Sequence, residues 1–364
     1  MNWLLQDVEE KPRRGNLVLL RAERRAMATT FEVAIPYGTP NAVEAAEAAL
    51  DEIDRIEQLL TVYRDDSDVS VLNVNGGGVA SPELFQLLQT CAVLGNDTAG
   101  AFDVAIGSLV KCWGFHKREG RVPTERELST AMYASGQRHV VLDDRIDTVK
   151  YLRPVELNFG AIGKGYALDR AAMILQRDWG IHSALLHGGG SSVRAVGTPP
   201  TNVRGWPVAL RHPAGDGRTL GVVYLNHQGL GTSAATYQHF DYEGKRYGHV
   251  LDPRTGRPAD GVQSASCVAG TAALADALST AIFVAGEVWT NHYCRTHPEV
   301  GGVLLAECGT GILPVSVVQE HRQGARAVSV VQEHGQDARA TVFNLDALAY
   351  DSRYESVLNF FPDD

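Results

Sequence analysis

The sequence predicts an α+β fold with antiparallel sheets. Short apolar strands and helices follow one another along the 364 residues, without the regular strand–helix–strand order that builds a parallel sheet. Hydrophobic residues make up 44% of the chain, enough for a buried core. The length suits one large domain or two ordinary ones.

The beginning of the chain divides into a lead-in and the first element of the folded unit. Residues 1–20 are polar, and we expect them to be loosely ordered, so that the folded domain spans 21–364. From Thr29 to Pro36 the residues alternate well enough to predict a strand.

Two helices are expected after this strand, each with a cap. Asn41 is expected to cap the first helix, with Glu44 reaching back to it as in a capping box. Ser81 is expected to cap the second, ahead of Pro82 at its first position.

A glycine-rich turn joins a strand to a helix in Asn158-Phe-Gly-Ala-Ile-Gly-Lys-Gly165. Glycine lets the backbone approach a ligand closely, and a helix N-terminus offers unpaired N–H groups to an anion. Lys164 adds a positive charge. The alternative is a simple packing turn, and no Ser or Thr follows Gly163-Lys164 as a phosphate-binding P-loop would require.

The segment from His249 to Thr280 carries the richest set of candidate ligands. It opens as a strand end that runs into a Pro/Gly turn, and it closes as a helix. On one face of that helix Asp276, Ser279 and Thr280 lie within one turn. Such hard oxygen ligands suit Mg²⁺. The alternative is a helix whose Asp and Thr only face solvent.

Charge and cysteine content exclude several classes of protein. The net charge is −10 and the pI about 5.6, which argues against nucleic-acid binding. Five scattered cysteines without a CxxC pair argue against a disulfide framework or a zinc site. We find no signal peptide or lipidation box, and no apolar run of the ~18 residues that a membrane span needs. We therefore expect a cytoplasmic protein without a membrane span.

A tandem 13-residue repeat interrupts the C-terminal part of the domain. Residues 315–327 are repeated almost unchanged at 328–340, so that His334 duplicates His321. Two copies are too few and too short for a solenoid. We expect a surface insertion at about 309–341 that separates the strand at 302–305 from its partner at 342–345.

The order of the motifs resembles the FAD:protein FMN transferase family (ApbE-like flavin transferases). The resemblance runs from about Arg24 to the C-terminus, apart from the insertion. It rests on these segments: Met27-Ala-Thr29, Gly100-Ala-Phe-Asp103, Gly163-Lys-Gly-Tyr-Ala-Leu-Asp169, Gly188-Gly189, His249-Val-Leu-Asp-Pro-Arg-Thr-Gly256 and Ala275-Asp-Ala-Leu-Ser-Thr280.

This resemblance implies duplicated antiparallel sheet-and-helix halves (T-fold-like) packed into one globular unit. It implies Mg²⁺-dependent transfer of FMN from FAD to a threonine hydroxyl of a target protein, with release of AMP. The acceptor would be a redox-complex subunit or a flavin-carrying domain. By resemblance, Ala161 (through its carbonyl), Asp276, Ser279 and Thr280 hold the metal. The positions that match the FAD site are Met27, Tyr63, Ala101, Phe102, Asp103, Asn158, Lys164 and Val250.

Catalytic roles would fall to His249 and Asp276. A histidine has a suitable pKa for the base that the acceptor hydroxyl needs, although a histidine at a strand end is often only a structural hydrogen-bonder. Backbone N–H groups of the glycine-rich turns would hold the pyrophosphate oxygens. A metal would neutralise the pyrophosphate charge.

The sequence departs from the family pattern at several positions. Many relatives carry Asp where Asn158 and Ser279 stand, and the family's Thr-Ser-Gly-Asp-Tyr is replaced by 232–237, Thr-Ser-Ala-Ala-Thr-Tyr. Ser233-Ala-Ala-Thr236 faintly resembles the acceptor sequence of flavinylated proteins, which leaves self-modification of Thr236 open. Two other functions therefore stay open: Mg²⁺-dependent hydrolysis of FAD to FMN and AMP, and FAD binding without turnover.

Overall fold

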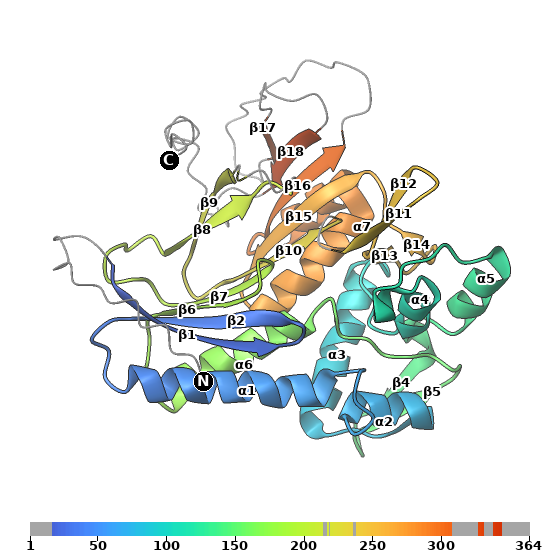
Figure 1. Cartoon of the computed structure of the whole chain (residues 1–364), viewed down its shortest axis with the longest axis horizontal. Helices are drawn as coiled ribbons and strands as arrows, with labels where there is room; N and C mark the ends of the chain where they lie inside the picture. The colour runs from blue at the N-terminus through green and yellow to red at the C-terminus, as the bar shows by residue number, and fades with distance from the viewer. Residues whose placement is uncertain are drawn as a thin grey trace.

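The computed structural model describes residues 17–213, 217, 219–235 and 238–307, together with the backbone of 327–330 and 338–343. In this part of the chain, one antiparallel sheet of nine strands forms the centre of the molecule (Figure 1). Its order is β1 (Leu19–Ala26), β2 (Thr29–Pro36), β6 (Ala184–Gly188), β7 (Ser192–Val196), β10 (Gly229–Ala234), β15 (Val262–Ala269), β16 (Gly301–Glu307), β18 (Ala338–Phe343) and β17 (Ala327–Val330). The predicted α+β class is confirmed.

Three helices pack side by side along one face of this sheet: α1 (Ala42–Leu60), α6 (Gly163–Arg177) and α7 (Ala272–Thr296) (Figure 1). α1 lies on β1 and β2, α6 on β6 and β7, and α7 on β10, β15 and β16. Alanines such as Ala45, Ala49, Ala167 and Ala171 are fully buried between them. Small side chains at these positions let the helices approach closely. The opposite face is covered by the hairpin of β8 (Trp206–Arg211) and β9 (Thr219–Leu225).

The remaining elements form a second group at one end of the sheet (Figure 1). A small cluster that contains Trp113, Leu128 and Leu251 joins its helices to its hairpins, and the Trp113 indole donates to the Gly256 carbonyl (2.7 Å). The helices are α2 (Asp68–Asn75), α3 (Pro82–Asp97), α4 (Gly107–Cys112), η1 (Phe115–Lys117), α5 (Glu125–Tyr133) and η2 (Gln137–His139). The strands are β3 (Gly77–Val79), β4 (Val140–Asp143), β5 (Thr148–Tyr151), β11 (His239–Tyr242), β12 (Lys245–Gly248), β13 (Leu251–Asp252) and β14 (Arg257–Pro258).

Helix α7 is by length and composition apolar enough to cross a membrane, although the sequence analysis found no such run. Half of its most apolar window is buried in the protein. Gly286, with φ 75°, interrupts its helical geometry. Its apolar character is explained by its packing on the sheet and against the neighbouring helix α6.

Both predicted cap residues stand at the start of their helices, but neither side chain makes a capping hydrogen bond. Asn41 stands at the start of α1, but its φ of 54° is left-handed and its side chain makes no cap hydrogen bond. A capping side chain needs an extended backbone to reach the first turn, so the predicted capping box is wrong. Ser81 precedes α3 with an extended backbone, yet its buried hydroxyl has no partner among the described residues.

The chain ends and the repeat are described only in part. β1 begins at Leu19, before the expected end of the lead-in, and residues 1–16 lie outside the described residues. Within the repeat, 327–330 forms the edge strand β17, and 338–340 belongs to β18, which lies between β16 and β17. β18 pairs with β16 through Gly302–Phe343 and Val303–Val342, as expected for these two segments. The rest of the insertion, with His321 and His334, and Thr236 lie outside the described residues, so their roles stay predictions.

Candidate functional site

The N-terminal turns of α6 and α7 contact each other on the helix-covered face of the sheet, near its middle strands. Their contact depends on Gly165, because a Cβ there would lie 2.1 Å from the Ala272 carbonyl oxygen. Asp169 of α6 accepts hydrogen bonds from the Ala272 and Ala273 N–H groups at the start of α7 (2.9 and 2.8 Å). Arg194 of β7 pairs with the same carboxylate at 3.2 Å. The helices are thus fixed by side-chain caps that cross from one to the other.

Asp276 makes the reciprocal contact from α7 to α6. Its Oδ2 accepts from the Gly165 N–H (2.8 Å) and from the Ser192 hydroxyl (2.9 Å). The residue is only 6% exposed. Burial raises the pKa of Asp276 to about 6, although Lys164, Ser192 and the Gly165 N–H oppose the shift. No hydrogen bond from the described residues reaches Oδ1, so one carboxylate oxygen is available to a cation.

Three hydroxyls surround the next turn of α7. Ser279 and Thr280 donate to the Asp276 carbonyl (2.8 and 3.3 Å). The Ser233 hydroxyl of β10 lies 3.0 Å from Ser279 Oγ and 3.1 Å from Thr280 Oγ1. The structure therefore brings Asp276, Ser279 and Thr280 together as predicted, and it adds Ser233 and Ser192.

His249 lies between β12 and β13 and is held in one orientation. Its Nδ1 is 3.0 Å from the Gln238 carbonyl, which only accepts, so Nδ1 carries the proton. Nε2 is then an unprotonated acceptor. Burial lowers the pKa of His249, and nearby Lys164 lowers it further. Lys164 thus acts electrostatically on both His249 and Asp276.

Three backbone N–H groups of the glycine-rich turn already have hydrogen-bond partners inside the protein. The Gly163 N–H donates to Phe159, the Tyr166 N–H to Ile162, and the Gly165 N–H to Asp276. These N–H groups are therefore not free for a phosphate. The Phe159, Ala161 and Lys164 N–H groups of this turn have no hydrogen-bond partner among the described residues. The Gly165 N–H is unavailable because Asp276 already caps the helix, and the use of the remaining N–H groups by a phosphate stays a prediction.

The other residues assigned by resemblance have identifiable local roles. Asp103 accepts from the Ala105 and Gln137 N–H groups (2.7 and 2.9 Å), and burial raises its pKa. Ala101 and Phe102 are fully buried beside it. Asn158 accepts from the Gly160 N–H at 2.9 Å, which shapes the turn that carries Ala161.

The other three positions that match the FAD site have the following surroundings. Tyr63 is 69% exposed and stacks on His116, with ring centroids 4.7 Å apart. Met27 has a left-handed φ of 47°, and its N–H donates to Glu57 (2.7 Å). Val250 is buried next to His249. None of these contacts by itself assigns a ligand.

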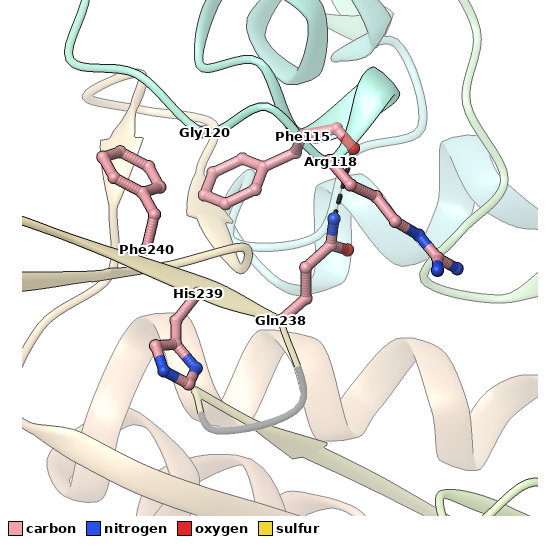
Figure 2. A pocket seen from close by; sticks show the side chains of 6 residues that line it. All are labelled: Phe115, Arg118, Gly120, Gln238, His239 and Phe240. Atoms are coloured by element: carbon pink, nitrogen blue, oxygen red, sulfur yellow. Dashed lines mark hydrogen bonds between the residues drawn. The ribbon is translucent and has the colours of Figure 1, made fainter.

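A pocket of about 240 Å³ lies close to His249 along the chain (Figure 2). Gln238 connects the two, since its carbonyl holds His249 while its side chain donates to the Phe115 carbonyl (3.2 Å). The side chains that line the pocket are Phe115, Arg118, Gln238, His239 and Phe240, with Gly120. The sequence analysis missed this pocket, because its walls are more than 100 residues apart in the chain.

The described residues contain no group of three or more His, Cys, Asp or Glu side chains that could hold a metal. A cation at Asp276 would therefore be held by one carboxylate with hydroxyl and carbonyl oxygens. Of the five cysteines, the four in the described residues are free, as predicted.

The fold is α+β, and the N-termini of α6 and α7 are capped reciprocally by Asp276 and Asp169, with the Ser279 and Thr280 hydroxyls in the following turn of α7. The model of the ApbE family matches residues 27–304, and the chain belongs to that family. The duplicated halves that this implies are visible in the sheet, where β1–β2 leads to α1 and β10–β15 leads to α7.

Relatives and solved structures agree with this family. The chain is 32% identical over 280 residues to the FAD:protein FMN transferase of Treponema pallidum, covering 71% of this chain and 77% of the relative. It is 28% identical to that of Escherichia coli K12, covering 72% and 78%. The ApbE protein of Thermotoga maritima superposes with a TM-score of 0.72 at 31% identity, covering 79% and 94%. Flavinyl transferase ApbE of Pseudomonas stutzeri gives 0.71 at 26%, covering 81% and 93%.

Proposed function

We propose that this protein transfers FMN from FAD to a threonine hydroxyl of an acceptor protein, with Mg²⁺ as cofactor and AMP as the leaving product. The family and its named transferases support the transfer of FMN from FAD to a protein. The observation that carries the proposal is the buried Asp276, whose Oδ2 is held by Gly165 and Ser192 while Lys164 acts on its pKa. The Ser279 and Thr280 hydroxyls lie in the next turn of α7 and donate to the Asp276 backbone carbonyl.

The residues around Asp276 fit a hard divalent cation. Asp276 Oδ1, the Ser279 and Thr280 hydroxyls and the Ala161 carbonyl would hold Mg²⁺, since all are oxygen donors. When bound, Mg²⁺ would neutralise the pyrophosphate charge and polarise the phosphorus. Lys164 would contribute a second positive charge close by. Ser192 and Gly165 would orient the carboxylate from behind.

The proton of the acceptor hydroxyl would pass to His249. Its Nε2 is the free acceptor, and its lowered pKa keeps it neutral at pH 7. The acceptor oxygen would form a bond to the FMN phosphorus as the P–O bond to the AMP phosphate breaks. The electron pair of that bond leaves with AMP, and the proton stays on His249. Met27, Tyr63, Ala101, Phe102, Asp103, Asn158 and Val250 would line the FAD site.

The test is incubation with FAD and MgCl₂, with and without a threonine-bearing flavin-carrier domain, followed by intact mass of both proteins and AMP quantitation. We expect a covalently flavinylated acceptor and one AMP per transfer. AMP and free FMN without acceptor would indicate FAD hydrolysis instead. Tight FAD binding without AMP would indicate a binding protein. Flavin found on the transferase itself would point to Thr236.

A further inference from the structure

Strand β10 lies directly on helix α7, and two glycines make this contact possible. A Cβ at Gly229 would lie 2.4 Å from Ala272 Cα, and one at Gly231 would lie 2.5 Å from the Ala275 carbonyl. Residues 229, 231 and 233 share one face of the strand because side chains alternate. Ser233 is therefore the next residue along this face after two positions that admit only glycine.

Successive residues on this face of β10 lie against successive positions along α7, and this determines what Ser233 contacts. Position 229 lies against Ala272 and position 231 against Ala275, and Ser233 Oγ reaches Ser279 Oγ at 3.0 Å and Thr280 Oγ1 at 3.1 Å. The Ser233 hydroxyl thus stands between two side chains that the proposed function assigns to the metal.

The protons of these hydroxyls can be assigned. Ser279 and Thr280 both donate to the Asp276 carbonyl, as serine and threonine commonly do inside helices. Each hydroxyl has one proton and two lone pairs. With their protons directed at the helix backbone, Ser279 and Thr280 can only accept from Ser233. Their remaining lone pairs then point away from the helix.

We propose that Ser233 is a positioning residue that sets the Ser279 and Thr280 oxygens for a divalent cation; this rests on the proposed function. Its single proton bonds one of the two oxygens at a time, Ser279 Oγ at 3.0 Å or Thr280 Oγ1 at 3.1 Å. Position 279 carries a neutral hydroxyl rather than a carboxylate. A neutral ligand binds a cation less strongly than a charged one, so its orientation matters more.

A merely structural role predicts a different result. The close packing of β10 on α7 is provided by Gly229 and Gly231, and the protons of Ser279 and Thr280 are satisfied without Ser233. Removing the Ser233 hydroxyl should therefore leave the metal-free fold almost unchanged. The matched control is Thr232, the adjacent residue of β10, whose hydroxyl faces the other side of the sheet and pairs with Ser266 (2.9 Å).

The experiment compares wild type, Ser233→Ala and Thr232→Ala at full length. Mn²⁺ replaces Mg²⁺ as the probe, and free Mn²⁺ is measured by electron paramagnetic resonance in the presence of FAD, with a protein-free FAD blank. We expect Ser233→Ala to weaken Mn²⁺ affinity about 10-fold, a common effect of losing a residue that orients metal ligands. Thr232→Ala should bind Mn²⁺ like wild type. In turnover, Ser233→Ala should raise the apparent KM for Mg²⁺ while kcat at saturation stays close to wild type.

Equal Mn²⁺ affinity in wild type and Ser233→Ala would overturn the inference, and so would equal weakening in both variants. Absence of Mn²⁺ binding in wild type would overturn it together with the metal assignment. A wild type that binds Mn²⁺ but transfers no FMN would refute only the proposed function, because the binding comparison still decides the role of Ser233. Metal-free urea unfolding checks that both variants fold.

Discussion

The raised pKa of Asp276 makes a quantitative prediction about the Asp276→Asn variant. The pKa is about 6 in the folded protein against an ordinary value of 3.8, a difference of about two units. Each unit corresponds to 1.36 kcal/mol, so ionised Asp276 costs the metal-free fold about 3 kcal/mol. The penalty is absent below about pH 3.8, where the carboxyl is protonated in both states, and it develops fully as the pH rises through about 6.

The assay is urea unfolding in chelator at several pH values between 4 and 7.5. Asparagine has the shape of the protonated carboxyl and no charge. We therefore expect the free energy of unfolding of Asp276→Asn to rise relative to wild type by up to about 3 kcal/mol across this range. A difference that stays constant with pH would show that Asp276 does not have the raised pKa, and the reasoning would fail.

Binding of Mg²⁺ should reverse which of the two proteins, wild type or Asp276→Asn, is the more stable. Mg²⁺ with FAD should raise the unfolding free energy of wild type, since a ligand that binds only the folded state stabilises it, and should leave Asp276→Asn unchanged. Asp169→Asn is the matched control, because Asp169 is also a buried carboxylate with a raised pKa that caps a helix. It should keep the wild-type response to Mg²⁺. An Asp276→Asn variant that Mg²⁺ stabilises like wild type would exclude Asp276 as a ligand.

Three further substitutions test neighbouring parts of the site. His249→Ala should lower kcat by about 10²-fold or more while FAD affinity, measured by flavin fluorescence, is retained; normal turnover would remove His249 as the base. Lys164→Met should weaken FAD binding and make it less sensitive to salt; an unchanged salt response would place Lys164 away from the pyrophosphate. Gly165→Ala puts a Cβ 2.1 Å from the Ala272 carbonyl and should cost about 3 kcal/mol of unfolding free energy or more; wild-type stability in urea would contradict the close contact of α6 and α7.

The sequence predicted those parts of the site that depend on local spacing. Asp276, Ser279 and Thr280 lie within one helical turn, so their proximity follows from helix geometry. Asn41 was mistaken for a side-chain cap because the residue type does not reveal the backbone angle, and here φ is 54°. Ser192 and Ser233 could not be assigned, because their contacts depend on how two strands lie against α7. The alternating Gly229-x-Gly231-x-Ser233 was the available signal, since two glycines on one strand face predict a close helix.

Under the proposed function, the reciprocal caps give a physical reason for a cation at this site. A helix N-terminus attracts anions through its partial positive charge, and an open α6 turn would have suited a pyrophosphate. The Gly165 N–H already donates its hydrogen bond to the Asp276 carboxylate. Once ionised, it adds a negative charge where the phosphates would bind, so FAD meets repulsion there. Lys164 alone balances one charge, whereas the pyrophosphate and Asp276 together carry about three. A divalent cation on the free Asp276 oxygen would turn the repulsive group into a ligand for the cation.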